Sequence, residues 1–171
     1  MRGQDLLNAL ADELKGLAPE LAQAYDSGTE AGSSARASDD DPYVTSVSRL
    51  SEAAGYMGLA GVQRICASVL ANLEHLCGED ADARVLVRGF FTEWAPLLES
   101  HLRDAANVWH VDALCAHFGG AWVPVPLDDA ALKDLRAELS AAPTSAPRST
   151  NPRTPRPKNS APRTSRSTSR T

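Results

Sequence analysis

The 171-residue sequence lacks any long hydrophobic run. No apolar stretch approaches the ~18 residues that a membrane-spanning helix needs, so we expect no membrane insertion. The first residues, MRGQDLLNALADELKG, are interrupted by acidic and basic side chains and do not form the apolar segment of a secretory signal. These absences favour a cytoplasmic protein.

Residues that hold metals, cofactors or nucleotides are also scarce. The three cysteines form no C-x-x-C pair and fall on apolar helical faces, which favours buried, reduced thiols. The four histidines lack metal-type spacing with a cysteine or carboxylate, and we interpret them as surface or half-buried residues. The glycine-rich GYMGLAG (55–61) lacks the lysine of a phosphate-binding loop, so we expect no metal, no cofactor and no kinase ATP site. These residues are Cys66, Cys77, Cys115, His75, His101, His110 and His117.

Acidic residues are absent from 143–171, a segment that contains seven Lys or Arg. The rest of the chain therefore has a net charge of −12, and so acidic a surface repels nucleic acid and anionic membranes. The 143–171 segment has no core-forming side chains, so we expect a disordered basic tail. It also has no aromatic residue to stack on bases, so protein partners are favoured over nucleic acid. A stand-alone helical binding protein with an anion-binding tail is one alternative.

Hydrophobic periodicity predicts a first helix over 1–25. Pro19 is expected to end or kink this helix near Leu17. The following residues, 26–41, are rich in Gly, Ser and Asp and predict a flexible linker. The apolar stripe of this helix consists of Leu6, Leu10, Leu14, Leu17 and Leu21.

Further apolar seams predict a helical bundle over 42–142. A second helix, Pro42–Met57, is expected to begin with Asp41 as its N-cap, and a third helix, Leu59–Leu76, follows the glycine break. A fourth helix should begin near Asp82 and be kinked or split at Pro96. Its Phe90 and Trp94 are expected to be buried against Val47, Leu50 and Val69. The seam of the second helix is Tyr43, Val47, Leu50, Ala54 and Met57.

The segments after the fourth helix are also predicted to be helical. The exception is 121–127, AWVPVPL, whose prolines predict an extended connection. No segment shows convincing strand-type alternation. The predicted fold class is therefore all-α: an antiparallel helical bundle with extra C-terminal helices and the disordered tail.

The polar side of the second helix has Thr45, Ser48 and Glu52 at positions i, i+3 and i+7. At about 100° per residue, Ser48 lies roughly 145° from the centre of the apolar seam, and Glu52 lies almost opposite it. We therefore expect these three residues to form an exposed stripe. A phosphotransfer residue must occupy such a position, because its partner domain approaches from the side.

The segment SRLSEAAGYMGLAGVQRICASVLANL (48–73) resembles the histidine phosphotransfer (HPt) domains of chemotaxis-type histidine kinases. The family motif is H-x-[LI]-K-G-[SGA]-A-x-x-x-G followed by an apolar residue. Its leucine matches Leu50, its alanine Ala54, its final glycine Gly58 and the apolar residue Leu59. The resemblance implies an HPt-like bundle whose partners are a response regulator or a kinase core.

Three positions depart from that motif. Ser48 replaces the phosphorylated histidine, Ser51 the lysine and Glu52 the first glycine. A serine hydroxyl needs a base to attack, and its phosphate ester is too stable to pass the group onward readily. Glu52 adds bulk and negative charge where phosphate oxygens would lie. We interpret the chain as a docking or scaffolding module without its own phosphotransfer, with Ser48 as a serine-type phosphoacceptor as the alternative.

A wider resemblance covers about Gln4 to Leu139. GLAGVQRIC, FFTEWAPLLESHL and LCAHFGGAWVPVPLDDAAL look like the N-terminal part of the large hybrid kinases of type IV pilus chemosensory systems. Those proteins place several HPt-like domains before a kinase core, and some of these domains have serine or threonine in place of histidine. The family's full-length members are histidine kinases, so the resemblance implies that this chain is a truncated piece without the catalytic core.

Overall fold

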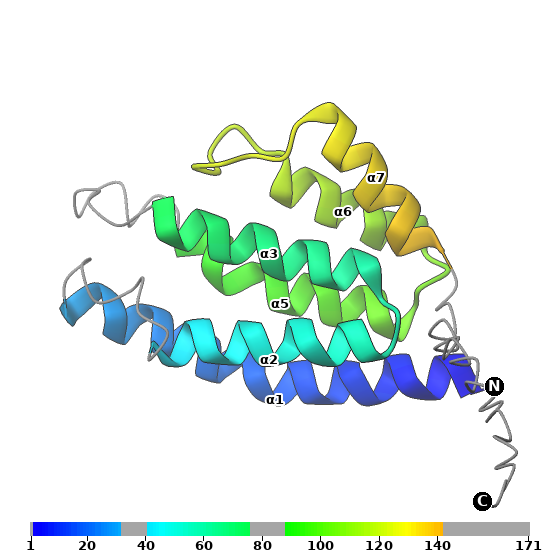
Figure 1. Ribbon diagram of the computed structural model, residues 1–171, viewed down its shortest axis with the longest axis horizontal. Helices are drawn as coiled ribbons and strands as arrows, with labels where there is room; N and C mark the ends of the chain where they lie inside the picture. The colour runs from blue at the N-terminus through cyan, green and yellow to red at the C-terminus, as the bar shows by residue number, and fades with distance from the viewer. Residues whose placement is uncertain (1, 32–40, 76–87, 142–171) are drawn as a thin grey trace, which may run out of the picture.

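The computed structural model describes residues 2–31, 41–75 and 88–141, and every regular element in these residues is an α-helix. Successive helices run in alternating directions, so neighbours in sequence are antiparallel (Figure 1). The predicted all-α class is confirmed for the described residues. The helices are α1 (Arg2–Ala31), α2 (Pro42–Tyr56), α3 (Ala60–His75), α5 (Arg88–Arg103), α6 (Val108–Phe118) and α7 (Asp129–Ser140).

The helices form three pairs across the molecule (Figure 1). Helices α1 and α2 lie along one side, α3 and α5 occupy the middle, and α6 and α7 cover the other side. The most extensive contacts join α1 to α5 and α2 to α3, while α6 packs on α5 and α7 packs on α3 and α6. One continuous cluster of buried apolar side chains runs through all six helices.

Helix α1 is longer than the sequence predicts. It continues through Pro19 to Ala31, so the expected end near Leu17 is wrong, and so is the expected linker over 26–31. Pro19 is exposed, while Leu21 and Tyr25 beyond it are buried, so apolar burial offsets the backbone hydrogen bond that proline cannot donate. The rest of the expected linker, 32–40, lies outside the described residues, as does the expected tail, 143–171.

The buried face of α1 is slightly rotated from the predicted leucine stripe. Leu10, Leu14 and Leu21 are buried as expected, but Leu6 is 49% exposed and Leu7 occupies the core instead. Because Leu6 and Leu7 are adjacent, a small rotation of α1 decides which of them faces the core. The packing of α1 on α5 places Leu7 there.

The turn between α2 and α3 is a Schellman motif. The Leu59 N–H donates to the Ala54 carbonyl at 2.9 Å, and the Gly58 N–H donates to the Gly55 carbonyl at 3.1 Å. Gly58 has a φ of 71°, the left-handed conformation that glycine adopts without a steric penalty. The predicted glycine break is thus a helix C-cap that turns the chain back to form an antiparallel pair.

Replacing Gly58 with alanine should destabilise the fold by about 1–2 kcal/mol, because a Cβ is strained at positive φ. Gly16→Ala is the matched control, since Gly16 lies within α1 with no neighbouring atom in the way. This change should stabilise the protein by about 0.5–1 kcal/mol. Urea unfolding of both variants measures the difference, and equal effects would contradict the assigned turn.

A buried aromatic cluster joins α1, α2 and α5. The Tyr43 hydroxyl donates to the Phe91 carbonyl at 2.9 Å and accepts from Trp94 Nε1 at 2.9 Å. Tyr25 stacks on Phe91 with the ring centroids 4.9 Å apart. The expected burial of Phe90 and Trp94 is confirmed, since neither side chain is exposed.

Tyr43→Phe should cost about 1–3 kcal/mol of unfolding free energy, because it leaves the buried Trp94 indole N–H without its acceptor. Tyr56→Phe removes the same hydroxyl from a side chain that is 86% exposed, and it should change stability little. Thermal or denaturant melts compare the two variants. A loss no larger at Tyr43 than at Tyr56 would show that the hydroxyl does not hold the helices together.

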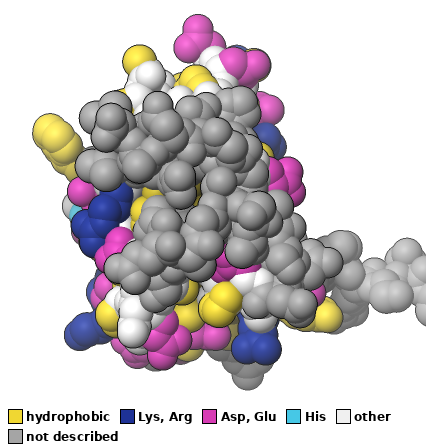
Figure 2. Space-filling view, turned by 90° about the vertical axis from the view of Figure 1, so that its left-hand side faces the viewer, with side chains coloured by type: hydrophobic (Ala, Val, Ile, Leu, Met, Phe, Trp, Pro, Cys, Tyr) yellow, Lys and Arg dark blue, Asp and Glu magenta, His cyan; other side chains and the backbone are white. Residues whose placement is uncertain are grey.

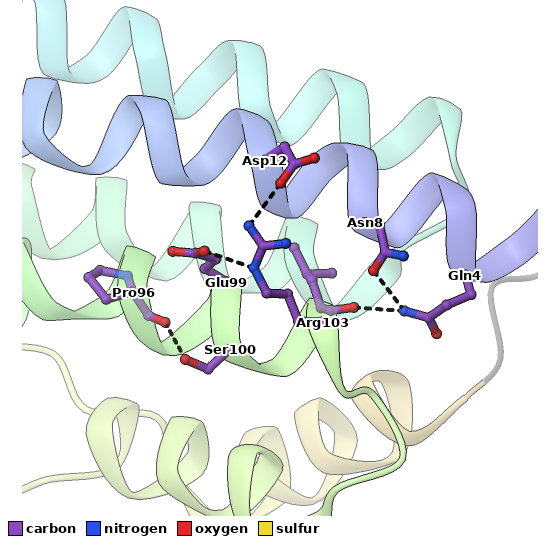
Figure 3. A network of polar contacts seen from close by, with 8 residues as sticks. Gln4, Asn8, Asp12, Pro96, Glu99, Ser100 and Arg103 are labelled. Carbon is purple, nitrogen blue, oxygen red and sulfur yellow. Dashed lines mark hydrogen bonds and ion pairs between the residues drawn. The ribbon is translucent and has the colours of Figure 1, made fainter.

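Helix α5 is continuous through Pro96, so the expected split is wrong. Pro96 is exposed, and its carbonyl accepts a hydrogen bond from the Ser100 hydroxyl at 2.9 Å. Polar contacts along the α1–α5 seam reinforce the helix (Figure 3). The Arg103 guanidinium contacts Asp12 of α1 at 2.8 Å and Glu99 of its own helix at 2.9 Å. The predicted start of this helix near Asp82 lies outside the described residues.

The connection from α6 to α7 is anchored by a buried asparagine. Asn72 of α3 accepts a hydrogen bond from the Val125 N–H at 2.7 Å and donates to the Val125 carbonyl at 3.2 Å. The predicted extended path over 121–127 is wrong at its beginning, where Val123 N–H closes a turn onto the Gly120 carbonyl. The Asn72 amide therefore satisfies the backbone N–H and C=O of Val125, which in a regular strand would bond to a neighbouring strand.

Candidate functional site

The solvent-facing side of α2 differs from the predicted stripe. Of Thr45, Ser48 and Glu52, only Glu52 is exposed, and the other two are half-buried. The expectation that Ser48 lies in an exposed stripe is therefore wrong. The exposed positions are instead Arg49, Glu52 and Tyr56, which again follow the i, i+3, i+7 spacing of one helical face.

Ser48 lies on the flank of α2 that turns toward α3. It precedes Gly55 by seven residues, so the two positions share one side of the helix. At Gly55 an added Cβ would lie 2.6 Å from Nε2 of Gln63, a side chain of α3, so this side of α2 faces α3. Because α2 and α3 are antiparallel, this register predicts Leu70, a partly buried core-contacting residue, beside Ser48. The sequence pattern reveals one buried face, whereas α2 packs against both α1 and α3.

The groups around Ser48 determine how reactive its hydroxyl can be toward phosphorus. Within the described part of the chain, no His, Asp or Glu side chain is hydrogen-bonded to the Ser48 hydroxyl to act as a base. Ser51 is half-buried and uncharged, while Glu52 places a carboxylate one turn away on the exposed side. A serine without a base is a poor nucleophile toward phosphorus, and the carboxylate repels an incoming phosphoryl group.

The exposed face of α2 carries one basic, one acidic and one aromatic side chain. We call Arg49, Glu52 and Tyr56 the α2 stripe. Tyr56 is 86% exposed, and neither Arg49 nor Glu52 forms an ion pair with another described residue. Tyrosine and arginine are the residue types enriched at protein interfaces. Figure 2 looks onto the end of the bundle where α1 and α3 end and α2 begins, and there the described side chains of both charge signs lie beside apolar ones.

Comparison with known proteins finds no match: no protein-family model, curated protein or solved structure is similar to this chain. Among the residues that the structure describes, no three His, Cys, Asp or Glu side chains are placed to hold a metal ion. The described helices include none that is both long and apolar enough to cross a bilayer.

Two histidines are core residues, contrary to the expectation of surface or half-buried positions. His101 is 3% exposed and His117 is 6% exposed, whereas His110 is half-buried as expected. His117 stacks on Phe90 with the ring centroids 5.2 Å apart, and its Nε2 lies 3.1 Å from the Phe90 carbonyl oxygen. His117 falls three residues after Leu114 on the buried side of α6, and this spacing is the signal that could have indicated its burial.

The two described cysteines are free and buried, as the sequence predicts. Burial raises the pKa of the Cys66 thiol to about 12, which removes the reactive thiolate at neutral pH. Burial also raises the pKa of Cys115. Cys77 and the side chain of His75 lie outside the described residues.

Acidification should destabilise the protein through the buried histidines. Burial is the main cause that lowers the pKa of both His101 and His117, although backbone hydrogen bonds oppose the shift. The unfolded chain then binds more protons than the folded one below pH ~6.5. The contribution of the two neutral histidines to the unfolding free energy is complete above pH ~6.5, and it is lost as the pH falls toward their lower folded pKa values.

The urea midpoint should therefore fall between about pH 7 and pH 5.5, and the fall should be smaller in His117→Phe, which keeps an aromatic ring against Phe90 but cannot be protonated. The slope against pH is the readout, so an overall loss of stability in the variant does not affect the comparison. The same slope in both proteins would contradict a neutral buried His117.

Proposed function

We propose that this chain is an HPt-like docking module of a chemosensory phosphorelay that binds a signalling partner through the α2 stripe and does not transfer phosphate itself. The observation that carries the proposal is the exposed α2 stripe of Arg49, Glu52 and Tyr56 beside a half-buried Ser48. The partner would be the receiver domain of a response regulator or a kinase core, as the motif resemblance in 48–73 implies.

Several features of the structure support the module type. Helices α1, α2, α3 and α5 alternate in direction, and the α2–α3 pair carries the matched motif positions. Gly58, which aligns with the motif's final glycine, occupies the left-handed turn that only glycine adopts easily. Leu50 and Ala54 are buried in the core, as matched structural positions should be.

Incubation with a chemotaxis-type kinase core and labelled ATP should place no phosphate on Ser48. The triple variant S48H/S51K/E52G should acquire acid-labile phosphate, because it supplies the nucleophile, the positive charge and the docking space that the motif requires, and an imidazole extends further from the backbone than the half-buried serine hydroxyl. Acid-stable phosphate on the unmodified chain, lost in Ser48→Ala, would overturn the proposal and make Ser48 an acceptor.

Docking should depend on the α2 stripe. Titration with a response-regulator receiver domain should show binding that Tyr56→Ala weakens by about tenfold or more, as expected for an aromatic residue at the centre of an interface. Trp109→Ala is the matched control, since Trp109 is also strongly exposed, at 82%, but lies on α6. Equal weakening by both changes, or by neither, would contradict docking through α2.

A further inference from the structure

The tryptophan at the beginning of α6 is the most exposed of the three in the chain. Trp109 is 82% exposed and its neighbour Val108 is 64% exposed, whereas Trp122 is 46% exposed and Trp94 is buried. Tryptophan is highly buried on average in folded proteins, because its indole ring has a large apolar area. Val108 and Trp109 therefore form an apolar surface that no described residue covers.

The end of α7 lies beside this surface. Arg136 of α7 forms an ion pair with Asp112 of α6, and the two helices run in opposite directions (Figure 1). Each step toward the beginning of α6 is therefore a step toward the end of α7. Trp109 precedes Asp112 by one turn on the same face of α6, so it lies level with the last residues of α7 and with Ala141, where the described chain ends.

The segment of chain that follows Ala141 is rich in proline and basic residues. Residues 142–171 contain six Pro and seven Lys or Arg, and no Asp or Glu. Four of these prolines and four of the basic residues fall within 147–158, PRSTNPRTPRPK. An extended chain advances up to ~3.5 Å per residue, so residue 147 can lie anywhere within ~20 Å of the end of α7. The segment 147–158 can therefore reach Trp109 without any rearrangement of the helices.

Arginine and proline are side chains that bind an exposed indole ring. A guanidinium is attracted to the negative face of an aromatic ring, and tryptophan is the best of the aromatic partners. Proline-rich segments dock on surface aromatic side chains at a low entropic cost, because the proline rings already restrict the backbone. Such a contact needs no hydrophobic core, which the composition of 143–171 cannot supply.

The charges of the two parts are complementary. The residues before 143 have a net charge of −12, and the segment 143–171 has +7. Asn107 holds a carboxylate close to Trp109, since its Nδ2 donates to Asp104 at 3.1 Å and its Oδ1 accepts from the Trp109 N–H at 3.1 Å. Asp104 forms no ion pair with another described residue. Because both parts belong to one chain, the tether gives a roughly millimolar effective concentration, so even a weak contact is populated.

We propose that the segment 147–158 binds across Val108 and Trp109 of its own chain, with arginine and proline side chains against the indole ring and basic charge beside Asp104. The contact joins the last part of the chain to the beginning of α6. It uses none of the α2 stripe, so this proposal and docking through α2 can each fail alone.

Solvent paramagnetic relaxation of the tryptophan indole N–H groups measures whether the ring is covered in the full chain. A neutral gadolinium chelate is the probe, because changes of charge in the segment do not alter its approach. The Trp109 resonance is identified by its loss in Trp109→Phe, and the buried Trp94 is the internal reference for slow relaxation. In the unmodified chain we expect slow relaxation at Trp109 and nuclear Overhauser contacts from its ring to side chains of 147–158.

The triple variant R148S/R153S/R156S removes three arginines from inside the segment. It should lower the equilibrium constant for covering Trp109 about fivefold or more, the ratio that one exposed cation–π contact supplies. The paramagnetic relaxation at Trp109 should therefore become faster, while that at Trp94 should not change. Thermal melts establish that the variant keeps the fold.

The matched control is R163S/R166S/R170S, which removes the same charge from outside the segment. It should change the relaxation at Trp109 far less, because it leaves the arginines and prolines of 147–158 in place. Dilution of the unmodified chain should leave the relaxation unchanged, since the contact lies within one molecule.

Relaxation at Trp109 that is as fast in the unmodified chain as in R148S/R153S/R156S would overturn the proposal. Equal effects of the two triple variants would overturn it as well, because they would show that general charge and not the segment 147–158 determines access to the ring. Faster relaxation on dilution would show that the ring is covered by a second copy of the chain, and that result would also overturn the proposal.

Discussion

The buried hydroxyl of Tyr43 fixes the arrangement on which the rest of the structure depends. It belongs to α2 and bonds to both the Trp94 indole and the Phe91 carbonyl of α5. Tyr25 adds α1 to the same cluster by stacking on Phe91. Apolar contacts alone tolerate small rotations of a helix, but a buried hydrogen bond has strict geometry and a large cost when it is broken. The cluster therefore sets the rotation of α2 about its own axis.

That rotation decides which chemistry α2 presents to other proteins. With Tyr43 buried, Arg49, Glu52 and Tyr56 point to solvent, and Ser48 turns toward the flank covered by α3. The Gly58 turn holds α3 against this flank. The position that corresponds to a phosphorylated histidine is thus half-covered, and no described His, Asp or Glu is hydrogen-bonded to it as a base. A docking role requires only the exposed face, which the same rotation provides.

The sequence predicted the α2 seam well because periodicity reports burial directly. Tyr43, Val47, Leu50 and Ala54 are all buried, and Asp41 caps the helix by accepting from the Tyr43 N–H at 2.7 Å. Local patterns also predicted the glycine turn, since Gly58 needs no distant partner to adopt its conformation.

The remaining features depend on neighbours that the local pattern does not contain. Pro19 does not end α1, because the long contact with α5 stabilises both sides of the proline. Ser48 is half-buried, and its seven-residue spacing from Gly55 puts it on the side of α2 that faces α3. His101 lines a cavity together with residues of α1 and α7, the first and last described helices, and such a cavity follows from tertiary packing alone.

The most direct test of the α2 orientation is the rate at which thiols introduced at Ser48 and Glu52 react with an alkylating reagent, measured peptide by peptide in the folded chain. The described native cysteines, Cys66 and Cys115, are buried and provide an internal reference for slow reaction. The thiol of Glu52→Cys should react rapidly, and the thiol of Ser48→Cys should react several-fold more slowly because α3 shields it. Equal rates at the two positions would mean that Ser48 faces solvent, and would contradict the orientation of α2 on which the docking account depends.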